Sequence, residues 1–423
     1  MTKKKIEIII SIITVILFLE PPLLSYYPQL NIVTKLYAFG RYAASFLFLI
    51  MFVFLASTRY NRSSIRMMKG SDNRKNNIIL IENATGFKNI YGIMLFSVFL
   101  NISLIIASYF NGTIYMTFVL SCATRVGFVA FNIVMFKELH EKLLDIYVKI
   151  LTALILLNSA TQILISRGFT GSGDGRVWLL GLKNTTTPYL LLDISIIAVL
   201  IFLNYYEKKI FIYIWLLLGC TIINRSSTAI IVIFLFTCVI ISQYFKKFEK
   251  YVNRKILIIG YILLWMFFFV VIYYNRELKI SVIIGNIFGK GGTFSGRINI
   301  WKQASSFFQD NYYWGAGIGL SFNPWYDQSI VVYSAHNSML EFLSKFGFFT
   351  GCIFALTVTM VFMKCLKIRN KKISILMSSA CILLFLAMQF EAIGNNYLFW
   401  MQMIIPYMLF DKGLTQIDLR SKL

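Results

Sequence analysis

The sequence predicts an all-α, polytopic integral membrane protein with about twelve transmembrane helices. Of its 423 residues, 58% are hydrophobic and only 14% are charged, whereas an ordinary soluble domain carries about 25% charged residues. The mean hydropathy is +0.71. The apolar residues also form runs of the length that crosses a bilayer, and Lys and Arg gather in the segments between these runs. A soluble fold could not bury this much apolar surface, so we expect lipid to be the solvent.

Twelve apolar runs are long enough to be spans, at about 20 residues each. They cover 6–25, 36–57, 89–110, 113–136, 144–166, 188–206, 210–223, 226–245, 256–275, 338–363, 373–391 and 396–411. The run 210–223 is short and the run 396–411 contains Pro406, so these two are the weakest of the set.

The distribution of positive charge predicts the orientation of the chain. Most of the 41 Lys and Arg residues fall in segments that share one side of the membrane. These segments are 1–5, 58–77, 137–143, 207–209, 246–255, 364–372 and 412–423. Because positive short loops mark the cytoplasmic side, we expect a multi-pass protein of the cytoplasmic (inner) cell membrane with both termini in the cytoplasm. The attraction of Lys and Arg to anionic lipid headgroups then explains the net charge of +23, and no nucleic-acid partner is expected.

We expect residues 1–423 to form a single membrane domain with two long extracytoplasmic loops, at 167–187 and 276–337. The second loop contains the stretch RINIWKQASSFFQ at 297–309. It places Ile298, Trp301, Ser305 and Phe308 at helical spacing. This pattern predicts a short amphipathic helix that lies on the outer surface.

Cysteine and histidine usage indicates neither a disulfide framework nor a metal centre. All six cysteines lie in or beside apolar runs, and the two histidines are His140 and His336. Such a set lacks the clustered ligands of a structural or catalytic zinc site. We therefore expect no metal and no cofactor.

Arg225 stands between two predicted spans, beside Asn224 and Ser226. A guanidinium with hydroxyl groups at a helix N-terminus suits an anion, because its fork matches phosphate oxygens and free backbone N–H groups add to it. The alternative is a capped helical hairpin with a solvated arginine. Two further arginines, Arg41 and Arg125, interrupt apolar runs. They are either functional there, or they snorkel to the interface or form structural pairs with a carbonyl or carboxylate.

Arg297 follows the glycine-rich stretches Gly289-Lys290-Gly291-Gly292 and Ser295-Gly296. Glycine lets the backbone come close to a phosphate, and Arg297 would then be the first residue of the predicted surface helix. A flexible loop before an ordinary first-turn arginine is the alternative, since a glycine-rich loop alone is a weak signal.

His336 stands where the long loop re-enters the membrane. A neutral imidazole there can take a proton from a hydroxyl group. Glu341, one turn further on, can orient His336 or pair with Lys345 instead. The alternative for His336 is a structural hydrogen bond.

These elements together resemble the O-antigen polymerase/ligase superfamily. The resemblance rests on Gly296-Arg297-Ile298-Asn299-Ile300-Trp301, Gly315-Ala316-Gly317-Ile318-Gly319, His336-Asn337-Ser338 and Asn224-Arg225-Ser226. It covers roughly 210–410, while the N-terminal half matches only in the number and placement of spans.

The resemblance implies a GT-C-like, metal-independent, inverting membrane glycosyltransferase. Its donor would be a glycan on polyprenyl pyrophosphate (undecaprenyl in bacteria) and its acceptor a sugar hydroxyl. It implies His336 and Arg297 as the catalytic residues, with His336 as the general base. Arg297 and Arg225 would be ligands of the pyrophosphate. Arg176, Arg167 and Arg125 are weaker candidates for the same role, and Glu341 is a candidate substrate-binding residue.

We therefore expect a polysaccharide polymerase for capsule, exopolysaccharide or O-antigen synthesis, with chain-length regulator and flippase proteins as expected partners. An O-antigen-type ligase, which moves a finished glycan to a lipid or protein acceptor, fits nearly as well. A lipid-linked oligosaccharide flippase fits less well, because no internal repeat is visible. A purely structural assembly subunit would leave Arg225, Arg297 and His336 dispensable.

Overall fold

The computed structural model describes residues 3–26, 31–68, 74–170, 176–207, 211–273, 297–323, 331–394 and 396–410. The α-helices are α1 (Lys3–Phe18), α2 (Leu23–Tyr26), α3 (Asn31–Met68), α4 (Arg74–Phe110), α5 (Met116–Leu139), α6 (Glu141–Leu164), α7 (Thr187–Phe202), α8 (Phe211–Asn224), α9 (Ser227–Tyr244), α10 (Arg254–Phe267), α12 (Arg297–Asp310), α13 (Ser338–Leu366), α14 (Lys371–Met388) and α15 (Tyr397–Phe410). Smaller elements are the strands β1 (Val177–Trp178) and β2 (Gly181–Leu182), the 3₁₀ turns η3 (Lys183–Thr186) and η5 (Glu249–Tyr251), and the π-helical turn η6 (Phe268–Tyr273).

The helices confirm an all-α polytopic membrane protein. Within the described residues, nine helices are long and apolar enough to cross a membrane. Two shorter apolar helices, Ile212–Asn224 and Tyr397–Phe410, coincide with the two runs that the sequence marks as weakest. Helices satisfy their own backbone hydrogen bonds, which is why they can cross lipid. The count of twelve spans and the GT-C-like assignment stay predictions.

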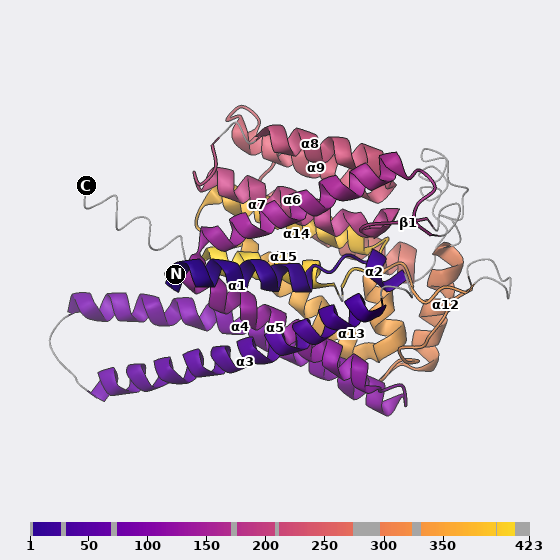
Figure 1. Ribbon diagram of the computed structural model, residues 1–423. Helices are drawn as coiled ribbons and strands as arrows, with labels where there is room; N and C mark the ends of the chain where they lie inside the picture. The colour runs from indigo at the N-terminus through magenta and orange to yellow at the C-terminus, as the bar shows by residue number, and fades with distance from the viewer. Residues whose placement is uncertain are drawn as a thin grey trace.

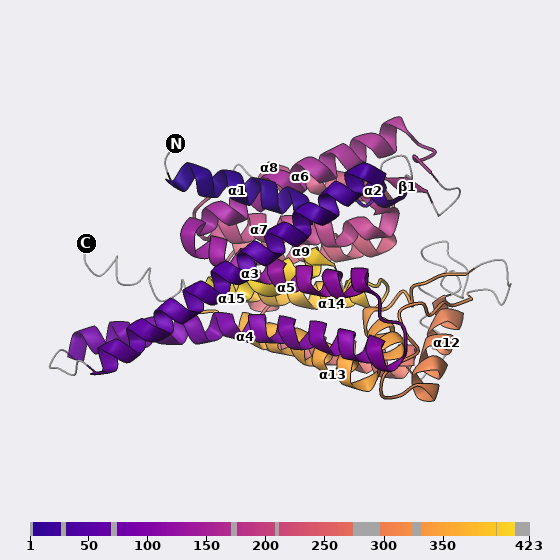
Figure 2. The same ribbon diagram turned by 60° about the horizontal axis from the view of Figure 1, so that its bottom comes forward.

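The long helices run side by side along a common direction, and α12 lies across that direction at one end of the bundle (Figures 1 and 2). The β1–β2 hairpin lies at the same end (Figure 1), and we call this end the loop end. Trp301, Ser305 and Phe308 of α12 are buried, while Lys302 is exposed. The predicted amphipathic helix at 297–309 is therefore confirmed, and it packs crosswise over the ends of the spans.

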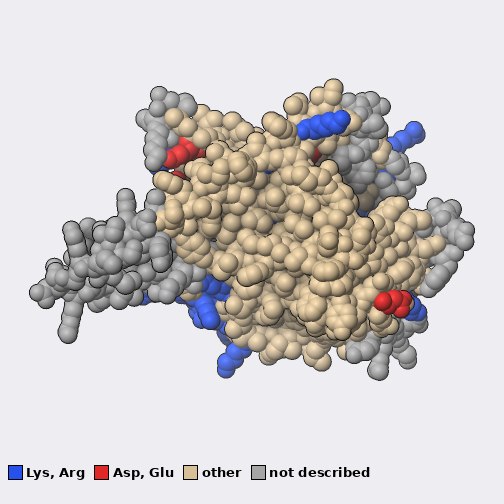
Figure 3. Space-filling view, turned by 90° about the horizontal axis from the view of Figure 1, so that it is seen from below, with Lys and Arg blue, Asp and Glu red and all other residues tan. Residues whose placement is uncertain are grey.

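Large apolar side chains cover the sides of the bundle. Phe39 on α3 is 71% exposed, Phe99 on α4 is 56% exposed and Ile259 on α10 is 56% exposed. The face in Figure 3 has a broad central area without charged side chains. Exposure of such a surface to water is unfavourable, whereas exposure to lipid tails, which are equally apolar, is not.

α13 is broken at Gly347, whose φ of 76° and ψ of −173° are not helical. The break leaves the carbonyl groups of Ser344 and Lys345 without partners inside the helix. The glycine loop that follows α12 supplies N–H groups that bond to them. Ala316 N donates to Ser344 O at 2.8 Å and Gly317 N donates to Lys345 O at 3.0 Å. In return, Phe348 N donates to Tyr312 O at 2.8 Å.

The two backbones meet so closely that glycine is required on both. A Cβ atom at Gly315 would lie 2.3 Å from the carbonyl carbon of Lys345, and one at Gly347 would lie 2.1 Å from Tyr313 O. Asn111, between α4 and α5, adds hydrogen bonds from Nδ2 to Trp314 O and Lys345 O at 3.2 and 3.3 Å. The Gly-x-Gly-x-Gly loop at 315–319 thus holds the first, short part of α13 in position.

We predict that Gly347→Ala lowers the melting temperature of the detergent-purified protein markedly, or prevents its purification. The backbone conformation at Gly347 costs about 1–3 kcal/mol for other residues, and the added Cβ meets rigid backbone. Gly319→Ala is the matched control, since a Cβ atom there meets nothing within 4 Å. Equal melting temperatures for the two variants would contradict this account of the break.

Candidate active site

The short first part of α13 begins at a site built by three consecutive residues. Asn337 is the N-cap, and its side chain accepts a hydrogen bond from Leu340 N at 2.9 Å. Such a cap replaces the partners that a helix start lacks. His336 precedes the cap with a φ of 47°, in the left-handed region that favours glycine.

Asn337 and Ser338 also fasten this helix start to the segment between α14 and α15. Asn337 Nδ2 donates to Gln389 O at 3.0 Å, and Ser338 Oγ donates to Glu391 O at 2.9 Å. Ser338 Oγ in turn accepts from Ile393 N at 2.8 Å. These buried contacts carry the Glu391 side chain to His336, although 55 positions separate the two in the chain.

Glu391 stands between the two residues that the sequence selects as catalytic. Its Oε1 accepts a hydrogen bond from Arg297 Nη2 at 2.8 Å, and its Oε2 lies 3.7 Å from His336 Nδ1. The side chains of Glu391 and Arg297 are only 11% and 13% exposed, while that of His336 is 30% exposed. The carboxylate is thus largely withdrawn from solvent, and the imidazole remains accessible.

This arrangement can perform general base chemistry. A carboxylate near Nδ1 favours the tautomer that carries its proton there, which leaves Nε2 free to accept a proton. The 3.7 Å separation exceeds a hydrogen bond, but such contacts commonly shorten when a substrate binds. Arg297, the first residue of α12, holds the carboxylate from the other side.

Glu341 has other partners. Its Oε1 lies 2.5 Å from Lys345 Nζ, and its Oε2 accepts a hydrogen bond from Ala335 N at 2.6 Å. Lys345 Nζ also donates to Tyr333 O at 2.6 Å. Of the two roles considered for Glu341, these contacts correspond to the pairing with Lys345. Its role in substrate binding stays a prediction.

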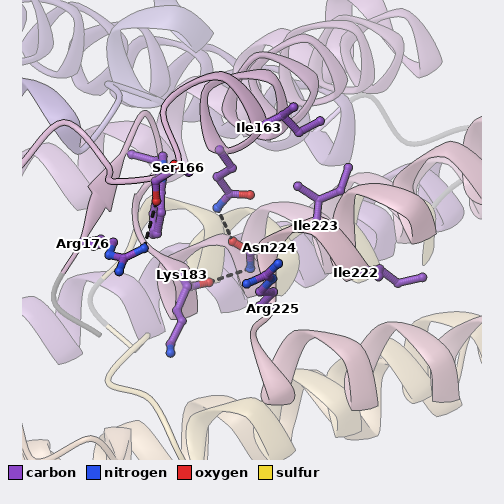
Figure 4. A pocket seen from close by; sticks show the side chains of 10 residues that line it. Ile163, Ser166, Arg176, Lys183, Ile222, Ile223, Asn224 and Arg225 are labelled. Atoms are coloured by element: carbon purple, nitrogen blue, oxygen red, sulfur yellow. Dashed lines mark hydrogen bonds between the residues drawn. The ribbon is translucent and has the colours of Figure 1, made fainter. Parts of the chain in front are cut away.

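A second group of basic residues lines a cavity of about 990 Å³ at the loop end. Arg225 enters it from the turn between α8 and α9, Arg176 from the residue before β1, and Lys183 from η3 (Figure 4). Arg176 Nη1 donates to Ser166 O at 2.9 Å. Arg225 is exposed, and no described residue accepts a hydrogen bond from its guanidinium. Three cations therefore share a hollow whose lining contains no carboxylate.

Asn224 fixes the floor of this cavity. Its Oδ1 accepts from Gln162 Nε2 at 2.7 Å, and its Nδ2 donates to Lys183 O at 2.7 Å and to the hydroxyl of Thr186. Arg225 follows with a φ of 53°, and Ser226 then caps α9 by accepting from Ala229 N at 3.4 Å. Asn224-Arg225-Ser226 is thus the capped hairpin considered as an alternative, and it also presents Arg225 to the cavity.

The opposite wall of the cavity is apolar. Ile163, Ile222 and Ile223 line it and are 64%, 68% and 37% exposed. Figure 4 shows these three side chains apart from Arg176 and Lys183. A hollow with a cationic side and an apolar side suits an amphiphile with an anionic head.

The structure thus sorts the predicted residues into groups. It brings Arg297 together with His336, and Arg225 together with Arg176. The hydrogen bonds and ion pairs described above lie within one group or the other. Arg167 is exposed in the turn after α6, beside Ser166 but not itself in the cavity lining. Arg125 lies apart in α5, and Gly289-Lys290-Gly291-Gly292 and Ser295-Gly296 lie outside the described residues.

Two residues of these groups escape the sequence reasoning. Glu391 is visible in the sequence only as a carboxylate at the end of an apolar run, because its partners lie 55 and 94 positions away. Lys183 lies in the predicted loop 167–187, but nothing local distinguishes it from an ordinary loop lysine. Both gain their significance from the residues that the fold places beside them.

Comparison with known proteins supports one family. Residues 212–355 match the family described as O-antigen ligase (Wzy_C). The matched segment runs from α8 into α13 and includes Arg225, Arg297 and His336, while Glu391 lies beyond it. The chain has no match among curated proteins. The family match, over residues 212–355, supports the resemblance of this multi-pass membrane protein to the O-antigen polymerase/ligase superfamily.

Proposed function

We propose that the chain is a polysaccharide polymerase. It would transfer a glycan from polyprenyl diphosphate to a sugar hydroxyl of another lipid-linked repeat unit, in capsule, exopolysaccharide or O-antigen synthesis. The observation that carries this proposal is the Glu391 carboxylate between Arg297 and His336. In the proposal the loop end faces the outside of the cytoplasmic membrane, as the charge distribution predicts, and both termini are cytoplasmic.

The cationic cavity would hold the head of the donor. Arg225, Arg176 and Lys183 can neutralise a diphosphate, because charge-assisted hydrogen bonds to phosphate are strong. The apolar wall at Ile163, Ile222 and Ile223 would receive the start of the polyprenyl chain. Charge on the departing diphosphate would be stabilised by these cations in place of a metal ion. The N–H groups of Arg297 that do not bond to Glu391 would donate hydrogen bonds to the diphosphate.

In the reaction, the acceptor hydroxyl oxygen attacks the anomeric carbon of the donor sugar. The bond from this carbon to the diphosphate oxygen breaks on the opposite side, which inverts the configuration. The hydroxyl proton passes to His336 Nε2, and Glu391 stabilises the imidazolium that forms. Polyprenyl diphosphate leaves as the dianion or trianion that the cavity holds.

An O-antigen-type ligase is the second candidate, because the matched family is described by that activity. It would use the same donor and the same general base, and it would differ only in the acceptor. Chain-length regulator and flippase proteins are the partners expected for the polymerase.

We predict that deletion of the gene leaves single lipid-linked repeat units on the outer leaflet, because repeats then arrive but are not joined. The measurement is extraction of lipid-linked glycans, followed by mass spectrometry and by labelling from outside. Long lipid-linked chains would instead identify a ligase, and repeats held on the inner leaflet would identify a flippase.

We expect His336→Ala and Arg297→Ala to abolish polymer while the proteins still insert into the membrane. General base catalysis contributes about 10²–10⁴-fold in rate, and loss of Arg297 leaves the Glu391 carboxylate without its ion pair. Polymer ladders on gels, with membrane-fraction immunoblots as the insertion control, measure the effect. Polymer of ordinary length from both variants would refute the roles assigned to them.

Glu391→Gln keeps the shape of the side chain but removes its charge. If Glu391 stabilises the imidazolium, this variant lowers kcat by roughly 10–100-fold or more, by analogy with the loss of a carboxylate that orients a metal-bound histidine, and changes KM little. Glu249→Gln is the matched control, because Glu249 forms an ion pair with Lys371 at 3.0 Å outside the site. A loss confined to KM would show that Glu391 serves binding rather than catalysis.

A further inference from the structure

Tyr333 lies three residues before His336, in the described segment 331–337 that leads into α13. Its side chain is 67% exposed, the largest value among the described aromatic residues between α12 and α13. Exposure alone carries little, because single exposed apolar side chains are common on protein surfaces. The packing of the neighbouring rings, the backbone around Tyr333 and its closeness to His336 along the chain set this residue apart.

The other described aromatic rings between α12 and α13 each pack against another ring. Their centroids lie 4.4–6.2 Å from those of their partners, in the pairs Trp314–Phe110, Tyr312–Phe348, Tyr313–Phe349 and Phe322–Phe307. Within the described residues, no ring packs on Tyr333 and no group bonds to its hydroxyl. The Tyr333 ring is therefore open to a ligand.

The ion pair of Glu341 and Lys345 holds the backbone on both sides of the Tyr333 side chain. Lys345 Nζ donates to Tyr333 O at 2.6 Å, and Glu341 Oε2 accepts from Ala335 N at 2.6 Å. The pair itself is close, at 2.5 Å, and its side chains are only 9% and 15% exposed. It thus ties the segment that carries Tyr333 and His336 to the first part of α13.

The same segment is tied to α12 through a second chain of contacts. Val332 N donates to Phe322 O at 2.9 Å and Phe322 N donates to Val332 O at 2.7 Å. Next to Phe322, Asn323 N donates to Gln303 Oε1 at 2.9 Å and Gln303 Nε2 donates to Asn323 O at 2.6 Å. A rigid backbone under an exposed tyrosine lowers the entropy that binding would cost, because only the side chain remains to be ordered.

Tyr333 lies within reach of the proposed general base. Three residues span at most ~10 Å, and Ala335, which lies between Tyr333 and His336, is fully buried. The side chain of His336 is 30% exposed, so both residues are accessible at the loop end. A glycan that covers Tyr333 can therefore place a hydroxyl of the same sugar, or of the next one, at His336.

A flat aromatic ring matches a sugar better than a lipid tail or a peptide. One face of a pyranose ring presents C–H groups, which carry slight positive charge, and the face of an aromatic ring is negative. A lipid tail has no flat face and packs equally well on any apolar side chain. The chemistry of Tyr333 thus favours a sugar as its ligand.

We infer that Tyr333 is the stacking platform for the sugar that supplies the acceptor hydroxyl. This inference rests on the proposed function, in which His336 takes the proton of that hydroxyl. The donor head would occupy the cationic cavity, whereas the acceptor glycan would lie across the segment 333–336.

The test varies the acceptor by itself, with the purified full-length protein. Lipid-linked repeat units extracted from the deletion strain serve as the donor. The acceptor is the oligosaccharide released from these units by mild acid and labelled at its reducing end, so that only its own extension is counted. We expect Tyr333→Leu to raise the KM for this oligosaccharide about 10-fold, by analogy with the loss of a base stacked on an aromatic side chain. The kcat and the melting temperature should stay near those of the wild type.

Two further variants separate stacking from a general need for an apolar side chain. Tyr333→Trp keeps a flat ring and should keep the KM near that of the wild type. Tyr313→Leu is the matched control, because Tyr313 is 61% exposed but packs on Phe349. It should also leave the KM for the oligosaccharide unchanged.

Each other outcome counts against the platform or against the function beneath it. Equal rises in KM from Tyr333→Leu and Tyr313→Leu would assign both tyrosines to the membrane interface and overturn the platform. A KM as high for Tyr333→Trp as for Tyr333→Leu, or a fall in kcat at unchanged KM, would overturn it as well. If the wild-type protein did not extend the oligosaccharide, the proposed function would fail, and this inference with it.

Discussion

Lipid offers no hydrogen bonds to a backbone, so a membrane protein can break a helix only where other groups take its exposed carbonyls. The break of α13 at Gly347 meets this requirement through the glycine loop at 315–317, and much of the loop end depends on it. Because the carbonyls of Ser344 and Lys345 are hydrogen-bonded, the short first part of α13 can change direction at the break. It packs against α12. Its start is where Asn337 and Ser338 meet the segment carrying Glu391. The close backbone contacts at Gly315 and Gly347 thus set the position of a histidine that stands eleven residues before Gly347.

The charges at the loop end are arranged in two different ways. Around Glu391, one carboxylate is shared by an arginine and a histidine, so the centre is close to balanced and its groups are held in fixed orientations. Around the cavity, Arg225, Arg176 and Lys183 line a hollow without a carboxylate in its lining, so the lining carries positive charge. A balanced centre suits proton transfer, whereas a cavity lined by cations suits anion binding. The proposed transfer from a lipid diphosphate would use both.

The sequence predicts the fold class because lipid imposes one dominant rule, which is a run of about 20 apolar residues for each span. It also predicts α12, because Trp301, Ser305 and Phe308 repeat at helical spacing, and it identifies Arg225, Arg297 and His336 through their order along the chain. It does not predict Glu391 or Lys183 as site residues, since neither has a local pattern. The grouping of the arginines is likewise beyond the sequence: Arg225 and Arg297 look like one site until the fold assigns Arg225 to the cavity and Arg297 to Glu391.

Arg225 and His336 share a conformation that side chains normally avoid. Each has a positive φ and stands directly before the residue that caps the next helix. Glycine would adopt this turn freely, whereas other residues are disfavoured by roughly 1–2 kcal/mol. A procedure that redesigns this backbone for stability alone would therefore choose glycine or asparagine at both positions. Under the proposed function, the presence of arginine and histidine there is a trade of stability for chemistry. A search for left-handed, non-glycine residues ahead of helix caps would find both without any knowledge of the family.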